Sequence, residues 1–353
     1  MTSRERVRLV LQHKEPDRIP ISDAPWGSTV QRWRTEGLPE DKGPGEYFGY
    51  EFGGVGFDGS MRMPGETIEE TERYKIYTTG DGAIRKSFKD HESTPELVGF
   101  TITNRKIWDE HKDRLKWDKS RVDWENGLKS CREQREKGFF VSISGVIGYD
   151  RVQAILGSPN LLMAMVDDPE WVKDMFDTVA DLWVAGLEEM IAGGFEFDGA
   201  FLYDDMGYRN ATLFSPAAFR ALSMPGHKRC YEAAHAHGLP TLLHSCGNVK
   251  AHIPALIEAG LDCLQPLEVK AGMDLIELKK AYGERLAFMG GIDVRAMANP
   301  DPSAIEKEIS TKIPVAKKGG GYIYHSDHSV PDNVSFQQYC RVMQLVKQHG
   351  SYQ

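Results

Sequence analysis

The chain has 353 residues, of which 41% are hydrophobic, 27% charged and 10% aromatic, a composition that predicts a folded globular protein and excludes a disordered one. Its formal net charge is −9 and its lysines and arginines form no basic stripe, so we expect no nucleic acid partner. The charged N-terminus is unlike a signal peptide, and no apolar run approaches ~18 residues, which predicts a cytoplasmic protein with no membrane contact.

The N-terminal third of the sequence shows few regular elements. Apolar residues at helical spacing predict a helix over residues 2–13, and a strand-like stretch follows at residues 18–22. Residues 27–65 are rich in glycine and proline and show little periodicity. Alternating sequences on both sides of a Gly-Asp-Gly turn at residues 80–82 then predict a β-hairpin, which we interpret as an antiparallel insertion over residues 71–105.

After residue 138, short apolar stretches alternate with amphipathic ones, which is typical of parallel strands joined by helices. Strands are predicted at residues 139–144, 199–203, 240–243, 261–266, 286–289 and 321–324. Helices are predicted at residues 169–192, 216–237, 250–259, 273–282 and 302–318. No Gly-x-Gly-x-x-Gly follows an early strand and the alternation continues to the C-terminus. We therefore expect an α/β fold closed as a (β/α)8 TIM barrel, with residues 1–353 forming a single domain that carries the hairpin insertion.

Polar residues follow the predicted strands at the end where barrel enzymes place their active sites. These strand-end sequences are Ser144-Gly145, Tyr203-Asp204-Asp205, His244-Ser245-Cys246-Gly247-Asn248, Glu268, Gly290-Gly291-Ile292-Asp293 and His325-Ser326-Asp327-His328. Each one alone is typical of a loop or a helix cap. Together they indicate a site at the mouth of the barrel.

The most specific of these sequences is His244-x-Cys246, directly after an apolar strand. Residues i and i+2 of an extended chain point to the same side, so this imidazole and thiolate would converge on one ion. Zinc suits a mixed nitrogen and sulfur pair, and a catalytic zinc needs a third protein ligand and an open position. His328 or Asp327, after the last strand, would supply that ligand across the mouth. The alternative is a core histidine beside a buried cysteine.

Several other strand-end residues are candidates for catalysis or substrate binding. The adjacent Asp204 and Asp205 would act as a base or orient the substrate, or else one would cap a turn while the other faces solvent. Glu268 would fix His244, contact the substrate or simply lie on the surface. We assign Asp204, Asp205 and Glu268 to catalysis. The residues expected to line the substrate pocket are Tyr203, Asp293, Trp26 and Met61, although Asp293 would equally cap a helix and the apolar residues would equally be core.

The cysteines predict no disulfide framework. There are five of them, an odd number, spread widely along the chain. We therefore expect free thiols.

Segments along nearly the whole chain match the pattern of one known family. They are Arg4-Glu5-Arg6-Val7, Lys14-Glu15-Pro16-Asp17-Arg18-Ile19-Pro20, Leu243-His244-Ser245-Cys246-Gly247-Asn248-Val249, Pro266-Leu267-Glu268-Val269-Lys270-Ala271-Gly272-Met273-Asp274, Gly290-Gly291-Ile292-Asp293 and Asp327-His328-Ser329-Val330-Pro331-Asp332-Asn333-Val334-Ser335. In these segments the chain resembles the uroporphyrinogen decarboxylase superfamily, and the resemblance implies a TIM barrel.

The resemblance to true uroporphyrinogen decarboxylases fails just after the first predicted strand. Those enzymes carry an arginine-rich stretch there to bind a tetrapyrrole with many carboxylates, whereas this chain has Ser22-Asp23-Ala24-Pro25-Trp26-Gly27. Burying carboxylates without such cations would carry a heavy desolvation cost. A tetrapyrrole decarboxylase is therefore the second choice.

The chain is more similar to the cobamide-dependent methyltransferases of the superfamily, which include coenzyme M methyltransferases and aryl-ether O-demethylases. Their zinc ligands follow a barrel strand as His-x-Cys, which implies that His244 and Cys246 bind zinc. Their coenzyme M branch has a third ligand, a cysteine, on the last strand, whereas this chain has Ser326-Asp327-His328 there and its nearest thiol, Cys340, lies in the last predicted helix. The third ligand stays open among His328, Asp327, His325 and Glu268, with His328 preferred.

The resemblance implies a zinc-dependent methyltransferase that moves a methyl group between a small methyl ether or thiol and a corrinoid cofactor, carried by a partner protein. The predicted hairpin would be an exposed flap or docking edge beside the barrel mouth, unless it is only decorative. The alternatives are a zinc-free decarboxylase of tetrapyrrole biosynthesis and a non-catalytic corrinoid or tetrapyrrole carrier. The carrier is disfavoured because the chain lacks an Asp-x-His-x-x-Gly motif. The substrate, the direction of transfer and the oligomeric state cannot be predicted from the sequence.

Overall fold

The computed structural model describes residues 1–90 and 95–352. Seven parallel strands form a curled sheet in the order β1-β6-β7-β8-β9-β10-β11. Their bounds are β1 Phe52–Gly56, β6 Phe140–Val146, β7 Gly199–Tyr203, β8 Thr241–His244, β9 Cys263–Gln265, β10 Ala287–Met289 and β11 Tyr322–Ile323. All six strands predicted after residue 138 are present; β7 has the predicted ends, and the ends of the other five are shifted.

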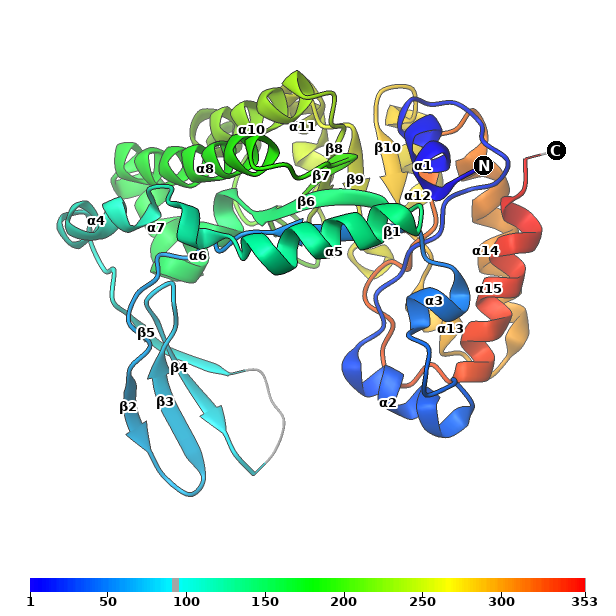
Figure 1. Ribbon diagram of the computed structural model, residues 1–353, viewed down its shortest axis with the longest axis horizontal. Helices are drawn as coiled ribbons and strands as arrows, with labels where there is room; N and C mark the ends of the chain where they lie inside the picture. Colours follow the sequence, from blue (N-terminus) through cyan, green and yellow to red (C-terminus); the bar gives the residue numbers. More distant parts are fainter. Residues whose placement is uncertain (91–94, 353) are drawn as a thin grey trace.

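Helices cover the outer face of this sheet (Figure 1). Their bounds are α1 Ser3–Leu11, α2 Gly27–Glu36, α3 Pro44–Phe48, α4 Arg105–His111, α5 Trp124–Glu136, α6 Gly148–Leu156, α7 Ser158–Asp167, α8 Pro169–Ala192, α9 Pro216–Ala218, α10 Met224–Ala236, α11 Ile253–Ala259, α12 Leu275–Tyr282, α13 Val294–Met297, α14 Pro302–Lys317 and α15 Phe336–Gly350. A π-helical turn, η3 Phe219–Ser223, joins α9 to α10. None of the helices in the described part of the chain is long and apolar enough to cross a membrane.

The edges of the parallel sheet meet at the segment around Ile21 instead of at a regular eighth strand. Ile21 forms a single parallel bridge with Tyr324, and its carbonyl accepts a hydrogen bond from the backbone N–H of Glu51 at 2.9 Å, just before β1. The prediction of an α/β fold is confirmed. The predicted eight-stranded barrel is confirmed only as a curled sheet of seven strands.

Strand β1 lies in the glycine-rich region for which the sequence predicted no element. Its sequence is Phe-Gly-Gly-Val-Gly, and it pairs in parallel with β6. A Cβ atom at Gly53 would overlap the side chain of Gln134 on α5, and one at Gly56 would lie 2.8 Å from the carbonyl oxygen of Ser144. Close packing therefore requires glycine in this strand, and this removed the apolar alternation by which strands are predicted.

Alternate residues of each parallel strand face two different cores. Leu242 of β8 packs inside the curled sheet with Met289, and Val7 and Val10 of α1 close the end at which the strands begin. Leu243, the next residue of β8 after Leu242, faces the other way and packs in the larger core beneath the outer helices. The opposite end of the curled sheet, where the strands finish, is left for the site.

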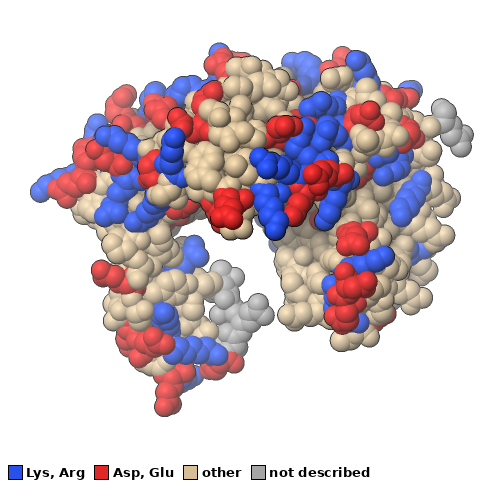
Figure 2. Space-filling model, viewed as in Figure 1, with Lys and Arg blue, Asp and Glu red and all other residues tan. Residues whose placement is uncertain are grey.

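The predicted hairpin insertion is a separate antiparallel sheet of four strands. The strands are β2 Thr67–Glu70, β3 Tyr74–Thr78, β4 Ala83–Phe88 and β5 Glu96–Phe100. The predicted hairpin is confirmed as β3 and β4, but it has a strand on each side. Its turn is tied to α6 by an ion pair of 2.8 Å between Asp81 and Arg151. The sheet projects from the body of the molecule (Figure 1), and a wide hollow separates it from the part that contains α2 and α3 (Figure 2).

Candidate metal centre and substrate cavity

The alternation of inward-facing and outward-facing side chains continues past the ends of the parallel strands, so the polar residues there point to two different sides. From Phe201 to Met206, partly exposed residues alternate with buried ones, so Tyr203 and Asp205 face the inside of the curled sheet while Asp204 faces the helices. By the same rule, Leu242, His244 and Cys246 lie on one side of β8 and its extension. Asp205, His244 and Cys246 therefore converge at the mouth.

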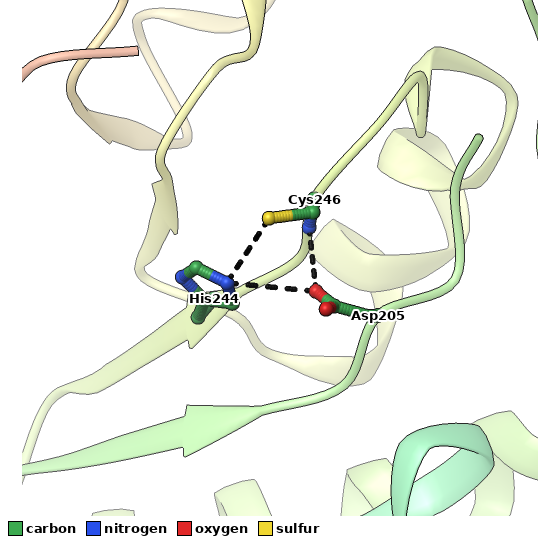
Figure 3. A group of neighbouring side chains, drawn as sticks. All are labelled: Asp205, His244 and Cys246. Atoms are coloured by element: carbon green, nitrogen blue, oxygen red, sulfur yellow. Dashed lines mark hydrogen bonds and ion pairs between the residues drawn. The ribbon is translucent and has the colours of Figure 1, made fainter. Parts of the chain in front are cut away.

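Among residues 1–90 and 95–352, one group of three histidine, cysteine or carboxylate side chains is arranged to hold a metal ion, and it consists of Asp205, His244 and Cys246 (Figure 3). Its three candidate ligand atoms lie within 4.8 Å of one another. His244 Nε2 is 3.3 Å from Cys246 Sγ and 3.5 Å from Asp205 Oδ1. One nitrogen, one sulfur and one oxygen ligand suit zinc and leave room for a fourth ligand.

The loop after β8 holds Cys246 in place through backbone hydrogen bonds. Asp205 Oδ1 accepts from the N–H of Cys246 at 2.7 Å, and Glu268 Oε2 accepts from the N–H of Gly247 at 2.6 Å. Gly247 has φ +76° and packs against Gly207. A Cβ added at Gly247 would lie 2.4 Å from the carbonyl carbon of Gly207. Only glycine fits this crossing of two loops.

The ring of His244 is oriented by a residue of the next strand. Gln265 Oε1 accepts a hydrogen bond from His244 Nδ1 at 2.5 Å, so the lone pair of Nε2 points toward Cys246 and Asp205. Gln265 Nε2 lies 3.4 Å from His325 Nε2, and His325 Nδ1 donates to the carbonyl of Ser326 at 2.7 Å. Metal-binding histidines typically have such a partner on their second nitrogen.

The electrostatics of the group favour a bound cation. Burial raises the pKa of the Cys246 thiol, and the charges of Asp205 and Glu268 raise it further. Burial also lowers the pKa of His244, which keeps the imidazole neutral and able to coordinate. A divalent cation would reverse the first effect, because it stabilises the thiolate directly. We name Asp205, His244, Cys246 and Gln265 the inner group.

A second polar cluster lies behind the first, under the helices, and we name Asp204, His227 and His252 the outer group. All three residues are buried. Asp204 Oδ2 lies 2.9 Å from His227 Nε2 on α10, and Oδ1 accepts from the N–H of Asp150 at 2.7 Å. Burial raises the pKa of Asp204 to about 6. Gly148 has φ +54°, and a Cβ there would lie 2.2 Å from Asp204 Oδ2, so the carboxylate fills the space beside it.

The inner group borders a cavity of about 640 Å³ that enters the curled sheet. Its wall is formed by Ser22, Asp23, Ala24, Phe52, Gly53, Gly54, Val55, Gly56, Ser142, Ser144, Phe201, Tyr203, His244, Cys246, Gln265, Pro266, Met289, His325, His328 and Ser329. The predicted pocket residue Tyr203 is part of this wall, with its ring 5.3 Å from that of His244. The cavity is large enough for a small-molecule substrate next to a metal ion.

The residues expected to complete the metal site lie in three different environments. His328 lines the cavity but is outside the group of three, and its ring meets Trp26 edge-on at 6.2 Å. Asp327 accepts hydrogen bonds from the N–H groups of Val269 and Val294, both at 2.9 Å, and so joins two strand-end loops. Glu268 supports the cysteine loop and pairs with Lys270 at 2.8 Å.

Three other expected pocket residues lie away from the cavity wall. Met61 is fully buried in the core, and Trp26 is 46% exposed. Asp293 caps the N-terminus of α13 and pairs with Arg295 at 2.7 Å. Asp204, expected to be catalytic, belongs to the outer group. Of the predicted residues, the structure thus brings together Asp205, His244 and Cys246, with Tyr203 and His328 on the wall of the adjoining cavity.

Gln265 and Asp150 are two of the residues near the inner group that the sequence analysis did not select, and His227 and His252 of the outer group are two more. Gln265 follows Cys263 at the inward spacing of two, and this signal was available in the predicted strand. Asp150 lies in the first turn of α6, where burial raises its pKa and the charge of Asp205 adds to this effect. No sequence signal indicated Asp150, because the helix that carries it was not predicted.

Comparison with known proteins now places this site in a family. The sequence profile of the uroporphyrinogen decarboxylase (URO-D) family matches residues 153–349, more than half of the chain. The chain belongs to the URO-D family. The matched region contains strands β7 to β11, and therefore Asp205, His244, Cys246 and Gln265.

Two relatives of this URO-D family chain are named as methyltransferases. The methylated-thiol–coenzyme M methyltransferase of Methanosarcina mazei is 25% identical over 155 residues, which cover 43% of this chain and 38% of that protein. A solved structure of a methyltransferase from Methanosarcina mazei covers 99% of both chains with a TM-score of 0.69 and 15% identity, which shows that the fold is shared. A β-L-arabinopyranosidase structure from Geobacillus stearothermophilus has a TM-score of 0.43 at 11% identity, covering 96% of this chain and 78% of that one, and supports no inference.

Proposed function

We propose that this URO-D family chain is a zinc-dependent methyltransferase that moves a methyl group between a small methyl ether or thiol and a corrinoid on a partner protein. The observation that carries the proposal is the convergence of Asp205, His244 and Cys246 at the mouth of a cavity. The names of the two Methanosarcina mazei relatives support the choice of reaction.

Asp205, His244 and Cys246 are the residues that would hold zinc. The donor set fits this ion, because a thiol and a carboxylate lie side by side at the half-buried mouth of the cavity, where a positive charge would stabilise both anions. When bound, zinc supplies Lewis acidity, which favours the anionic form of a thiol or withdraws electrons from an ether oxygen. His328, on the cavity wall, is in a position to contact the substrate from the other side.

The surrounding residues would hold this centre rigid and keep water away from the reacting group. Gln265 fixes the orientation of the His244 ring, and Glu268 fixes the loop that carries Cys246. Tyr203 covers one side of the imidazole, and Phe201 extends this aromatic wall into the cavity. Such pre-organisation would let the substrate bind beside the metal ion without further rearrangement of the side chains.

The tetrapyrrole decarboxylase alternative is disfavoured by the cavity wall. Asp23 lies in that wall, at the place where decarboxylases of this family are expected to carry arginines. In the part of the chain that the structure describes, the wall contains neither lysine nor arginine. A substrate with several carboxylates would find no charge partner there.

A methyl transfer assay tests the proposed reaction in both directions. The zinc-loaded protein is mixed with methylcobalamin and a panel of thiols, or with reduced cobalamin and methyl ethers, and the absorbance of the corrinoid is followed. We expect zinc-dependent conversion of at least one pair, and loss of conversion in Cys246→Ala. Absence of conversion with every pair, together with efficient decarboxylation of uroporphyrinogen, would overturn the proposal.

A further inference from the structure

The cavity continues past the inner group into the interior of the curled sheet. Barrel interiors are normally filled by layers of large side chains. Here the inward positions of β1 and β6 at this level are Gly54, Gly56, Ser142 and Ser144, and all four line the cavity. Small residues on two neighbouring strands therefore leave an open pocket below the mouth.

The floor of this pocket contains a hydroxyl group without a partner. Ser142 is only 2% exposed, and its Oγ has no hydrogen-bond partner among the described residues. Ser144 stands two residues further along the same face of β6, and a Cβ placed at Gly54 would lie 3.0 Å from its Oγ. A buried hydroxyl that is left unpaired is costly, so Ser142 is poised to bind a polar group of a ligand.

A negative charge in the cavity wall selects the kind of polar group. The side chain of Asp23 is inaccessible to solvent and accepts hydrogen bonds from the hydroxyls of Tyr339 (2.7 Å) and Tyr324 (3.1 Å). Ser326 also donates to it. These donors are uncharged, and His325 Nδ1, 3.7 Å from Asp23 Oδ1, donates to the carbonyl of Ser326 instead of to the carboxylate. A ligand carboxylate or sulfonate in the same cavity would be repelled.

We propose that Ser142 and Ser144, opposite Gly54 and Gly56, form a subsite for an uncharged hydroxyl group of the substrate. The substrate class is then a small methyl ether or thiol that carries a hydroxyl at the end remote from the reacting group and bears no anionic group. This inference rests on the proposed function, because it takes the reacting end of the substrate to lie at Asp205, His244 and Cys246.

Matched series of thiols test the subsite without any methyl transfer. Binding to the zinc-loaded protein is measured by calorimetry for hydroxyalkanethiols of two, three and four carbons. Each is compared with the alkanethiol and the mercaptoalkanesulfonate of the same length. For the best-fitting length we expect the hydroxyl compound to bind about fivefold more tightly than the alkanethiol and at least about tenfold more tightly than the sulfonate.

Two substitutions assign the effect to the subsite. Ser142→Ala should abolish the preference for the hydroxyl compound and leave alkanethiol binding unchanged. Gly54→Ala places a methyl group against Ser144 and should weaken the longer thiols more than the shortest one. Thr241→Val is the control variant. It removes a buried hydroxyl at the first residue of β8, at the end of the sheet opposite the mouth, and should keep the full preference.

The possible outcomes separate the subsite from the proposed function. Three results would overturn the subsite without affecting the proposed methyl transfer. They are equal binding of the hydroxyl compound and the alkanethiol, tightest binding of the sulfonate, and an unchanged preference in Ser142→Ala. If no thiol binds in a zinc-dependent way, the proposed function itself fails and the subsite falls with it.

Discussion

The inner and outer groups contain the same kinds of residue but are built for different tasks. Each has an aspartate from the pair Asp204-Asp205 and at least one histidine. The inner group borders an open cavity and has a thiol beside an imidazole and a carboxylate, whereas the outer group is enclosed by helices, and Asp204 pairs there with His227 at 2.9 Å. The comparison shows that the direction of a side chain at a strand end, more than its type, decides whether it is available for chemistry.

Removal of a ligand from the inner group should have the largest effect. In Cys246→Ala and in His244→Ala we expect the affinity for zinc to fall at least about a thousandfold, because each leaves two protein ligands. Competition with a zinc-binding dye measures this affinity. Cys230→Ala is the matched control, since Cys230 is a buried thiol of α10 that faces the helices. An equal loss of zinc affinity in Cys230→Ala would show that the loss in Cys246→Ala does not come from removal of a metal ligand.

The two adjacent aspartates provide the next test. Asp205→Asn should weaken zinc binding about a hundredfold, because a neutral amide is a poor ligand for this ion. Asp204→Asn should leave zinc binding within about threefold of the wild type, because its carboxylate faces His227 and not the cavity. The same dye competition, with circular dichroism to check folding, measures both variants. A reversed order would show that the inward and outward assignments are wrong.

A smaller effect is expected at Gln265, which acts through His244. Gln265→Leu removes the acceptor at 2.5 Å from His244 Nδ1, and loss of such a partner typically weakens metal binding about 10- to 100-fold. Gln265→Glu keeps an acceptor oxygen and should restore most of the affinity. If Leu and Glu variants bind zinc equally, Gln265 does not orient the imidazole.

The outer group should respond in stability instead of in metal binding. Both ring nitrogens of His252 are buried without a hydrogen-bond partner among the described residues, and its ring stacks on Phe219 at 4.8 Å. Burial lowers its pKa from 6.5 to about 4. The unfolded chain therefore binds a proton near pH 6.5 and the folded chain only near pH 4. Above pH 6.5 the histidine is neutral in both states, and the free energy of unfolding does not depend on its protonation. As the pH falls from 6.5 to 4, the unfolded chain takes up the proton first, and the free energy of unfolding decreases by about 3 kcal/mol.

His252→Phe should remove this acid sensitivity and raise the free energy of unfolding at pH 7 by about 1 kcal/mol, because it replaces two unpaired polar atoms with a ring of similar shape. Urea denaturation at pH 7 and pH 5 measures both quantities, and zinc content should stay the same. An unchanged pH dependence in His252→Phe would refute the role assigned to this histidine.

The sequence predicted most of the parallel strands and the central pair of the site, because both depend on short-range alternation. Gly199–Tyr203 was predicted with its observed ends, and the i, i+2 rule placed His244 and Cys246 on one side. The same rule, applied to Tyr203, would have separated Asp205 from Asp204 and would have selected Gln265 after Cys263.

The features that were missed depend on contacts between distant segments. Strand β1 is glycine-rich because β6 and α5 pack closely against it, and no local pattern records this. The antiparallel sheet gained β2 and β5 because an isolated hairpin is marginal in water and needs further strands. Asp327 was a ligand candidate by position, but its carboxylate joins the loops after β9 and β10, and such contacts appear only in three dimensions.

The most direct test of the account is the metal content of the chain purified without added zinc. Elemental analysis is applied to the wild type and to Asp205→Ala, Cys246→Ala and His328→Ala. We expect about one zinc per chain in the wild type and in His328→Ala, and little zinc in the other two variants. A wild type without zinc after incubation with the ion, or full occupancy in Cys246→Ala, would contradict the central claim that Asp205, His244 and Cys246 form a zinc site.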